Sequence, residues 1–111
     1  MGNISIFGAV SSHSGSTKQG NVAGTITVLQ QFCSINGIPI LTQDCIMATP
    51  SHWYAGPAIA KLYHSHSQPI TSLLQSFVTI EGKPIAQPTD NSSSDYTGVV
   101  DSVQNFVTIG G

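Results

Sequence analysis

Short runs of alternating apolar and polar residues recur along the chain, and none continues to the length of a helix. The clearest runs each end in Ile and cover residues 32–35, 77–80 and 106–109. A period of two over short segments rich in Val, Ile, Thr and Phe is typical of β-strands. AGPAIAKLYH at 55–64 carries only a weak signal for a helical turn. The pattern therefore predicts a small all-β protein.

These runs belong to a sequence repeat. QQFCSINGIPI at 30–40, QSFVTIEGKPI at 75–85 and QNFVTIGG at 104–111 each begin Gln-x-Phe and reach a Gly two residues after an Ile. Asn-Gly at 36–37 and Glu-Gly at 81–82 are turn signals between strands. The prolines that follow, Pro39 and Pro84, favour strands at a sheet edge. Each unit is therefore predicted to be a strand, a turn and a second short strand.

The repeats are unevenly spaced. The interval from Gln30 to Gln75 is 45 residues and that from Gln75 to Gln104 is 29, so the first interval carries 16 extra residues. The extra residues fall around ATPSHWYAGPAIAKLYHSHSQ, which contains three of the four histidines, the single Trp and two of the three tyrosines. We therefore expect the unusual chemistry of the chain to lie in this insertion.

Charge is scarce in this chain of 111 residues, which suits one domain spanning 1–111. Three Lys, no Arg and five acidic residues leave a net charge of −2. That balance predicts no nucleic-acid surface and no basic patch for an anionic membrane. Charged residues make up 7% of the chain, against about 25% in an average domain, which favours an extracellular or virion protein over a cytosolic enzyme. We also find no secretory signal and no membrane span.

The two cysteines and one acidic stretch offer further candidate chemistry. Cys33 lies in an alternating run and is interpreted as a small core residue, whereas Cys45 follows Asp44 in a loop-like stretch and is expected to be the more accessible cysteine. Whether the two cysteines pair is left open. DNSSSDY at 90–96 lacks the spacing of a calcium loop and is interpreted as a solvated loop.

The repeats resemble those of the PAAR-repeat proteins. That family has a TSHGG-like start, units of the type GSPTVFVNGKPAARVGD and a Cys-Pro-x-His-Gly stretch after the first unit. This chain has GAVSSHSGS at 8–16, the three repeats, and TPSH at 49–52 followed by GPAI at 56–59. It departs from the pattern in lacking the literal Pro-Ala-Ala-Arg and in having Thr49 where the family has Cys.

The resemblance implies a small cone with a pseudo-threefold axis, in which Phe32, Phe77 and Phe106 occupy equivalent places. It implies a structural, non-enzymatic tip on the trimeric spike of a contractile injection machine, such as a type VI secretion system or a phage tail. Such a tip is membrane-piercing, touches the target membrane only transiently and is monomeric in isolation. On this basis we expect a protein made in the cytoplasm without a signal peptide, with no fused toxin and with any effector carried separately.

The histidines suggest a metal site on separate grounds. Residues i and i+2 of a strand face the same side, so His64 and His66 are expected to present both imidazoles to one point. Imidazole suits Zn or Fe, and structural zinc takes four N or S ligands. The chain offers His13, His52, His64, His66 and Cys45. Helped by the resemblance, which matches His13 and His52, we predict zinc held by the four histidines, with iron and a substitution by Cys45 as alternatives.

Two other functions stay open. A zinc-dependent enzyme needs three protein ligands, an open position and a general base. Glu81, the only Glu, lies in a repeat turn, which is a poor place for a base. A free-standing binding module for carbohydrate needs a row of exposed aromatic residues, and only Trp53, Tyr54 and Tyr63 lie near one another in sequence.

Overall fold

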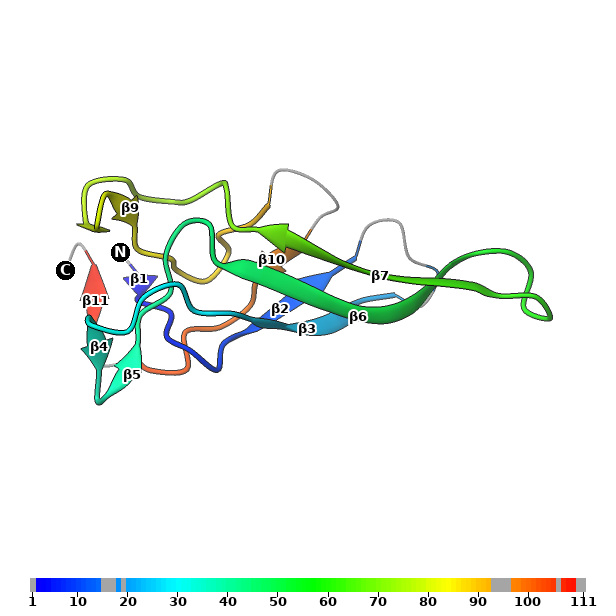
Figure 1. The fold of residues 1–111 in the computed structure, drawn as a ribbon, viewed down its shortest axis with the longest axis horizontal. Helices are drawn as coiled ribbons and strands as arrows, with labels where there is room; N and C mark the ends of the chain where they lie inside the picture. The colour runs from blue at the N-terminus through cyan, green and yellow to red at the C-terminus, as the bar shows by residue number, and fades with distance from the viewer. Residues whose placement is uncertain (1, 15–17, 19, 93–96, 106, 110–111) are drawn as a thin grey trace.

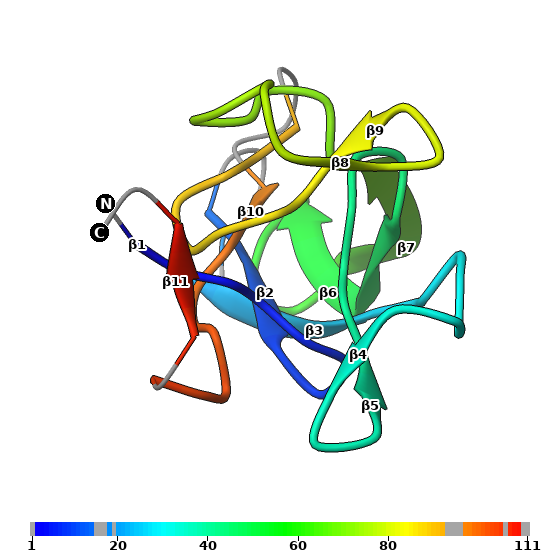
Figure 2. The ribbon, with the colours of Figure 1, turned by 90° about the vertical axis from the view of Figure 1, so that its left-hand side faces the viewer.

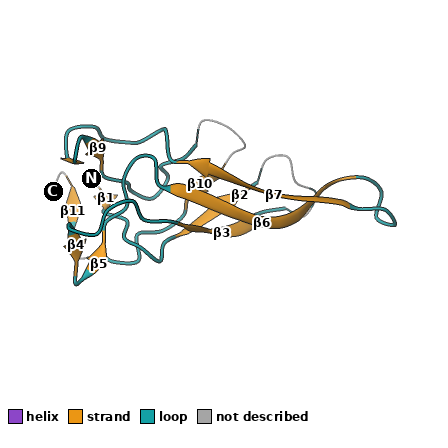
Figure 3. Cartoon of the chain, viewed as in Figure 1, coloured by secondary structure: helices purple, strands orange, loops and turns teal. Residues whose placement is uncertain are grey.

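A computed structural model describes residues 2–14, 18, 20–92, 97–105 and 107–109. This part of the chain contains strands and loops and no helix, so the predicted all-β class is confirmed (Figure 3). The molecule is elongated, with principal extents of 50 × 23 × 23 Å. Its strands are β1 (Gly2–Asn3), β2 (Val10–His13), β3 (Val22–Ile26), β4 (Ser34–Ile35), β5 (Ile38–Pro39), β6 (Ile46–Ala55), β7 (Leu62–Pro69), β8 (Thr79–Ile80), β9 (Lys83–Pro84), β10 (Thr97–Val99) and β11 (Thr108–Ile109).

The repeats form three short strand pairs at the wide end of the molecule, which we call the base. Strands β4 and β5 form one antiparallel hairpin, and β8 and β9 form another. In both hairpins the turn predicted from sequence has positive φ at its two central residues, Asn36–Gly37 and Glu81–Gly82. This geometry matches the twist of the flanking strands.

The third pair closes the base in a way that the sequence did not reveal. The third repeat supplies only its first strand, β11, which pairs antiparallel with β1 from the other end of the chain. Seen down the long axis, the three pairs lie at three places around a centre (Figure 2). The predicted cone of three pseudo-symmetric repeats is therefore formed, with its third repeat built from both ends of the chain.

One backbone ring joins the three repeats. Ser5 donates its N–H to the carbonyl of Ala86, Ala86 donates to Leu41, and Leu41 donates to Ser5, at 3.0, 2.9 and 3.0 Å. All three residues are fully buried. The ring pairs backbone groups that a sheet edge would otherwise leave open, and it locks the repeats to one another.

Isoleucines fill the base with threefold regularity. Ile35, Ile80 and Ile109 end the first strands of the three pairs, and each is buried. Ile40, Ile85 and Ile4 follow the second strands and pack into the same cluster, together with Ile6. Each buried side chain of this size contributes roughly 1.5–3 kcal/mol, so the six equivalent residues account for much of the stability of the base.

The buried Gln of each repeat is a second equivalent feature. Gln30 donates its amide to the carbonyls of Cys33 and Ile40, both at 2.9 Å, and accepts from the N–H of Cys33 at 2.8 Å. Gln75 makes the same bonds with Val78 and Ile85, and Gln104 makes them with Val107 and Ile4. The repeated Gln therefore ties the loop before each first strand to the end of its partner strand.

The repeated Phe has a different position. Phe32 and Phe77 follow their glutamines by two residues and are 65% and 72% exposed. They thus occupy equivalent places, as predicted, but on the surface; Phe106 lies outside the described residues.

Beyond the base the chain forms one curled antiparallel sheet in the order β10-β2-β3-β6-β7. Its last two strands form a long hairpin that extends past every other labelled strand, at the narrow end (Figure 1). The 16 extra residues of the first interval fall within this hairpin. At its end, residues 58–59 form a simple turn, closed by a bond from Ala60 N–H to the Pro57 carbonyl at 2.9 Å, rather than a helix.

Asp90 corrects one sequence interpretation. The sequence predicts a solvated loop at 90–96, of which residues 93–96 lie outside the described residues, but Asp90 is 1% exposed. Its carboxylate accepts the N–H groups of Leu74 and Gln87, both at 2.8 Å. Desolvation by burial raises the pKa of this carboxyl, and the two backbone hydrogen bonds oppose that rise.

Candidate metal centre

The His-x-His pair lies in strand β7, as the sequence predicted. Both His64 and His66 are half-buried, while Tyr63, Ser65 and Ser67 between and beside them are exposed. The two imidazole rings lie 5.0 Å apart, centroid to centroid. The strand thus presents both rings on the inner face of the hairpin.

A β-bulge brings His52 to the same face. Met47 and Thr49 of β6 are buried, so an unbroken alternation would point residue 51 inward and His52 outward. The pairing of Thr49 with His66 is followed by that of His52 with His64, which leaves two residues, Pro50 and Ser51, opposite Ser65 alone. The extra residue shifts the alternation, and His52 is fully buried.

His13 reaches the cluster because the sheet curls. It ends strand β2, two strands away from β6 in the sheet order, and is fully buried. Its Nδ1 lies 2.9 Å from the hydroxyl of Thr97, its register partner on β10. This contact orients the ring and leaves Nε2 as the nitrogen that can serve as a metal ligand.

The four imidazoles form one compact group. The ring of His66 lies 4.6 Å from that of His13 and 5.0 Å from that of His52. Ligand nitrogens of these three residues all lie within 4.8 Å of one another, which is close enough to hold a metal ion. In tetrahedral zinc sites with Zn–N bonds near 2.05 Å, two nitrogens lie about 3.3 Å apart. Small side-chain rotations therefore suffice to close the three histidines on an ion.

His64 joins the group through His52. The two Nε2 atoms lie 2.9 Å apart, and Nδ1 of His52 lies 2.8 Å from the carbonyl of Pro50. A carbonyl only accepts, so Nδ1 of His52 carries the proton and its Nε2 presents a lone pair. His64 therefore donates to His52 here, and it is not one of the three histidines whose ligand nitrogens all lie within 4.8 Å of one another. The Pro50 contact is the type of orienting hydrogen bond that metal-binding histidines commonly have.

Thr49 stands beside this group, where the resembled family has Cys. It pairs in register with His66 and is 3% exposed. Among the described residues its hydroxyl has no hydrogen-bond partner. A hydroxyl is a much weaker zinc ligand than a thiolate, so the histidines supply the donors here.

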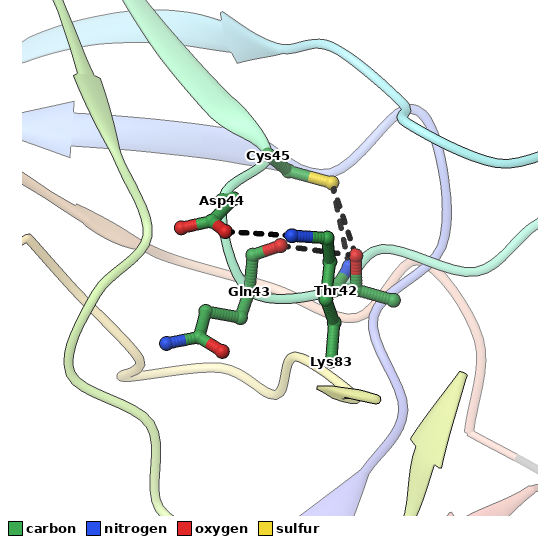
Figure 4. Close-up of polar contacts among 5 residues, drawn as sticks. All are labelled: Thr42, Gln43, Asp44, Cys45 and Lys83. Carbon is green, nitrogen blue, oxygen red and sulfur yellow. Dashed lines mark hydrogen bonds and ion pairs between the residues drawn. The ribbon is translucent and has the colours of Figure 1, made fainter. Parts of the chain in front are cut away.

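Cys45 does not join the cluster, and its expected accessibility is wrong. It is fully buried and packs with Leu41, Met47 and Ile70, whereas Cys33 is half-buried. Both cysteines are free. The thiol of Cys45 lies 3.4 Å from the N–H of Thr42 and 3.8 Å from its hydroxyl, beside the ion pair of Lys83 with Asp44 (Figure 4). Six residues of β6 separate Cys45 from His52, a distance of roughly 20 Å along the strand.

Aromatic residues lie next to the cluster on the outer part of the hairpin. The ring of Tyr54 stacks on that of His64 at 4.0 Å with an interplanar angle of 10°. Trp53 pairs in register with Tyr63, one step beyond the pairing of His52 with His64. The cluster therefore lies at the root of the projecting hairpin, and the end of the molecule is formed by the turn beyond it.

Searches against family models, curated proteins and solved structures found no match to this chain. Over the described residues, no helix has the length and apolar character that crossing a membrane would require.

Proposed function

We propose that this protein is a non-enzymatic, metal-stabilised tip of the PAAR-repeat type, which caps the trimeric spike of a contractile injection machine. One observation carries the proposal. A single chain builds a base with three equivalent strand pairs, joined by the backbone ring of Ser5, Leu41 and Ala86. Such a base can match the end of a homotrimer one repeat to one subunit, which resolves the mismatch between a monomer and a threefold partner.

The exposed side chains of the base support this docking. The loops that precede β4, β8 and β11 project at three places around the axis (Figure 2). Each carries an exposed aliphatic residue just before its buried Gln: Leu29, Leu74 or Val103. With Phe32 and Phe77 they form a ring of apolar groups that a monomer has little reason to expose. Contact with a spike would bury them.

The metal has a structural role in this proposal. The four histidines come from β2, β6 and β7, which are distant in sequence, at a point where the sheet narrows and little apolar core is present. An ion held there converts its binding free energy into folding free energy. Zinc fits the all-imidazole donor set in a tetrahedral arrangement, and iron is the alternative. The centre would fasten the hairpin to the rest of the sheet.

Docking is tested with a purified spike trimer from the same injection machine. Native mass spectrometry should show one copy of this protein per trimer, and the isolated protein should be monomeric. Leu74→Ser combined with Phe77→Ser should weaken the complex, whereas the distant Ile59→Ser should not. Any other stoichiometry, or a complex indifferent to the base substitutions, contradicts the proposal.

The metal is tested by elemental analysis of the purified protein and its variants. We expect one equivalent of zinc in the parent protein, none in His66→Ala, and a weakened site in His64→Ala. Cys45→Ser is the matched control and should retain the metal, because Cys45 is buried far from the histidines. Retention in His66→Ala, or loss in Cys45→Ser, would show that the ligand set is wrong.

A zinc-dependent enzyme is the second candidate, favoured by one observation. His13, His52 and His66 form a set of three that leaves a fourth position, as catalytic zinc sites do. Against this, no Asp or Glu among the described residues joins the group, and Glu81 lies in the β8–β9 turn at the base. If His64 occupies the fourth coordination position, exogenous imidazole or azide should leave the spectrum of a cobalt-substituted site unchanged. A shifted spectrum would favour the enzyme.

A further inference from the structure

Apolar side chains are exposed at the end of the β6–β7 hairpin, and no strand of the described part of the chain covers them. Ile59, at its turn, is 97% exposed, and Leu62 and Tyr63 are 52% and 55% exposed. These residues lie at the extreme narrow end of the molecule, beyond the other strands (Figure 1). Isolated exposed apolar residues are ordinary, but several apolar side chains gathered at the end of a protruding hairpin indicate a binding surface.

Two lysines lie beside Trp53 on the same hairpin. Nζ of Lys61 lies 4.7 Å from the centroid of the Trp53 ring, and Nζ of Lys18 lies 5.9 Å from it. The backbone N–H of Lys18 donates to the Trp53 carbonyl at 2.8 Å, and Trp53 Nε1 donates to Ala55 at 2.7 Å. Trp53 is thus held in place on the hairpin with a cation at its ring, and both lysines are exposed.

Charge is distributed unequally along the long axis. The sequence holds no Asp or Glu between Asp44 and Glu81, so the whole hairpin lacks acidic residues. The third lysine, Lys83, is at the base and pairs with Asp44 at 2.8 Å. Of the other acidic residues that the structure describes, Glu81 is in the β8–β9 turn, Asp90 is buried and Asp101 accepts the N–H of Val10. A protein of net charge −2 therefore presents a cationic, apolar tip, which its overall charge does not predict.

We propose that the hairpin tip binds the interface of an anionic phospholipid bilayer. Ile59 and Leu62 enter the apolar layer, Tyr63 and Trp53 lie at the headgroup level, and Lys18 and Lys61 contact lipid phosphates. Aromatic rings with one polar end, together with long basic side chains, are the groups that favour this boundary. Attraction to anionic lipid contributes through each lysine near the surface.

A glycan would be received differently. Sugars stack on open aromatic faces, but Trp53 has lysines at its ring and Tyr54 is stacked on His64. An acidic polymer would use the lysines and leave Ile59 and Leu62 in water. The lipid surface uses both kinds of group. This inference needs neither a spike nor an injection machine, so it goes beyond the proposed function and can fail or succeed separately from it.

The test is flotation of the purified, full-length protein with vesicles, without any spike protein. Vesicles of phosphatidylcholine with an equal share of phosphatidylglycerol should bind it, and vesicles of phosphatidylcholine alone should bind it far more weakly. Trp53 is the single Trp, so its fluorescence reports on the hairpin directly and should shift to shorter wavelength on binding. Raising the salt concentration should weaken binding because the lysine contribution is screened.

Variants with matched controls separate the apolar and basic contributions. Lys61→Gln should weaken binding about fivefold, and Lys18→Gln with Lys61→Gln about 25-fold. Ile59→Ser with Leu62→Ser should weaken it at least tenfold, since both side chains lose their transfer into the apolar layer. At the base, Lys83→Gln controls for charge and Phe77→Ser controls for exposed apolar area. Neither should change vesicle binding.

Several results would overturn the lipid proposal. One is no binding to the anionic vesicles. Another is equal binding to vesicles of phosphatidylcholine alone, which would show that binding does not depend on anionic lipid. A third is an equal effect of Lys83→Gln and Lys61→Gln, which would mean unspecific attraction. Binding that survives Ile59→Ser with Leu62→Ser and is competed by heparin would identify a polyanion site instead. The substituted positions are exposed, apart from the half-buried Lys83, and none belongs to the buried core, so near-identical far-UV spectra are expected for every variant.

Discussion

Replacement of the buried Gln of a repeat should destabilise the protein strongly, although Gln is usually a surface residue. Gln75 is 8% exposed and satisfies four backbone groups at once. Its amide donates to the carbonyls of Val78 and Ile85 at 3.0 Å, and its Oε1 accepts from the N–H groups of Phe77 and Val78 at 3.1 and 2.8 Å. Gln75→Ala removes all four bonds together.

The magnitude follows from what those groups can do afterwards. The Val78 carbonyl still accepts from Ile85 at 3.1 Å, and the N–H of the exposed Phe77 can turn to water. The Val78 N–H and the Ile85 carbonyl have no such replacement among the bonds described. Each such group left without a partner costs about 1–3 kcal/mol, so the two together lead us to expect that Gln75→Ala lowers the free energy of unfolding by roughly 2–6 kcal/mol. That is a large fraction of the ~5–15 kcal/mol typical of a domain.

The assay is urea unfolding of metal-loaded protein at constant pH and zinc concentration. Gln31→Ala is the matched control, because Gln31 has the same side chain beside the buried Gln30 but is exposed; its effect should stay within about 0.5 kcal/mol. Gln75→Glu keeps the acceptor and loses the donor, so at neutral pH it should also destabilise, and acid should restore part of the loss by protonating the carboxyl. A loss under about 0.5 kcal/mol for Gln75→Ala would refute the reasoning.

Three more predictions follow from single features of the fold. Deleting Ser51 removes the extra residue of the β6 bulge and leaves His52 two positions after the inward-facing Thr49 and still opposite His64, so elemental analysis should find the zinc retained; loss of the zinc would contradict this interpretation of the bulge. The difference in the free energy of unfolding between the parent protein and Asp90→Asn should narrow or reverse as pH rises from about 3.8 through the raised pKa of Asp90. The reason is that the protonated Asp90 carboxyl stabilises the parent fully only below pH 3.8, and this contribution is lost as the carboxyl ionises, whereas the amide of the variant does not titrate. Denaturant unfolding across this pH range tests the prediction, and a constant difference would contradict it. Glu81→Asn should stabilise by about 0.5–1 kcal/mol in thermal unfolding, since Glu81 has φ +51° and Asn36 occupies the equivalent turn position; a lower melting temperature would contradict it.

The strands and turns of the base could be predicted because their determinants are local. Alternation ending in Ile35 and Ile80, followed by a turn dipeptide with Gly, specifies a hairpin within a few residues of sequence. The pairing of β1 with β11 could not be predicted in this way. Gly2 and Asn3 carry no strand pattern of their own, and their partner lies more than 100 residues away.

Three of the four histidines predicted as ligands, His13, His52 and His66, lie close enough to hold an ion, but the geometry that brings them together could not be predicted. His64 and His66 share a strand face by simple alternation, and imidazole is a common metal ligand, so chemistry and spacing favour a common ion. The inward direction of His52 depends on a bulge at Pro50 and Ser51, and the approach of His13 depends on the curl of the sheet. Neither leaves a periodic signal. The expected accessibility of Cys45 was wrong because a loop-like sequence does not reveal that Cys45 packs against Leu41 and Ile70.

The chain combines a base of three equivalent repeats with a narrow end formed by a single extended hairpin. On the proposed function, the base matches a threefold partner only if the repeats stay equivalent, and the buried isoleucines and glutamines keep them equivalent. Three equal repeats converging on an axis cannot, however, all continue to a narrow end, because their side chains would meet there. Here one interval alone is extended, as β6 and β7, and it forms the whole narrow end. A lone hairpin of this length is marginally stable in water. The histidine cluster lies at its root, where an ion would join β6 and β7 to β2 and so supply the rigidity that packing cannot.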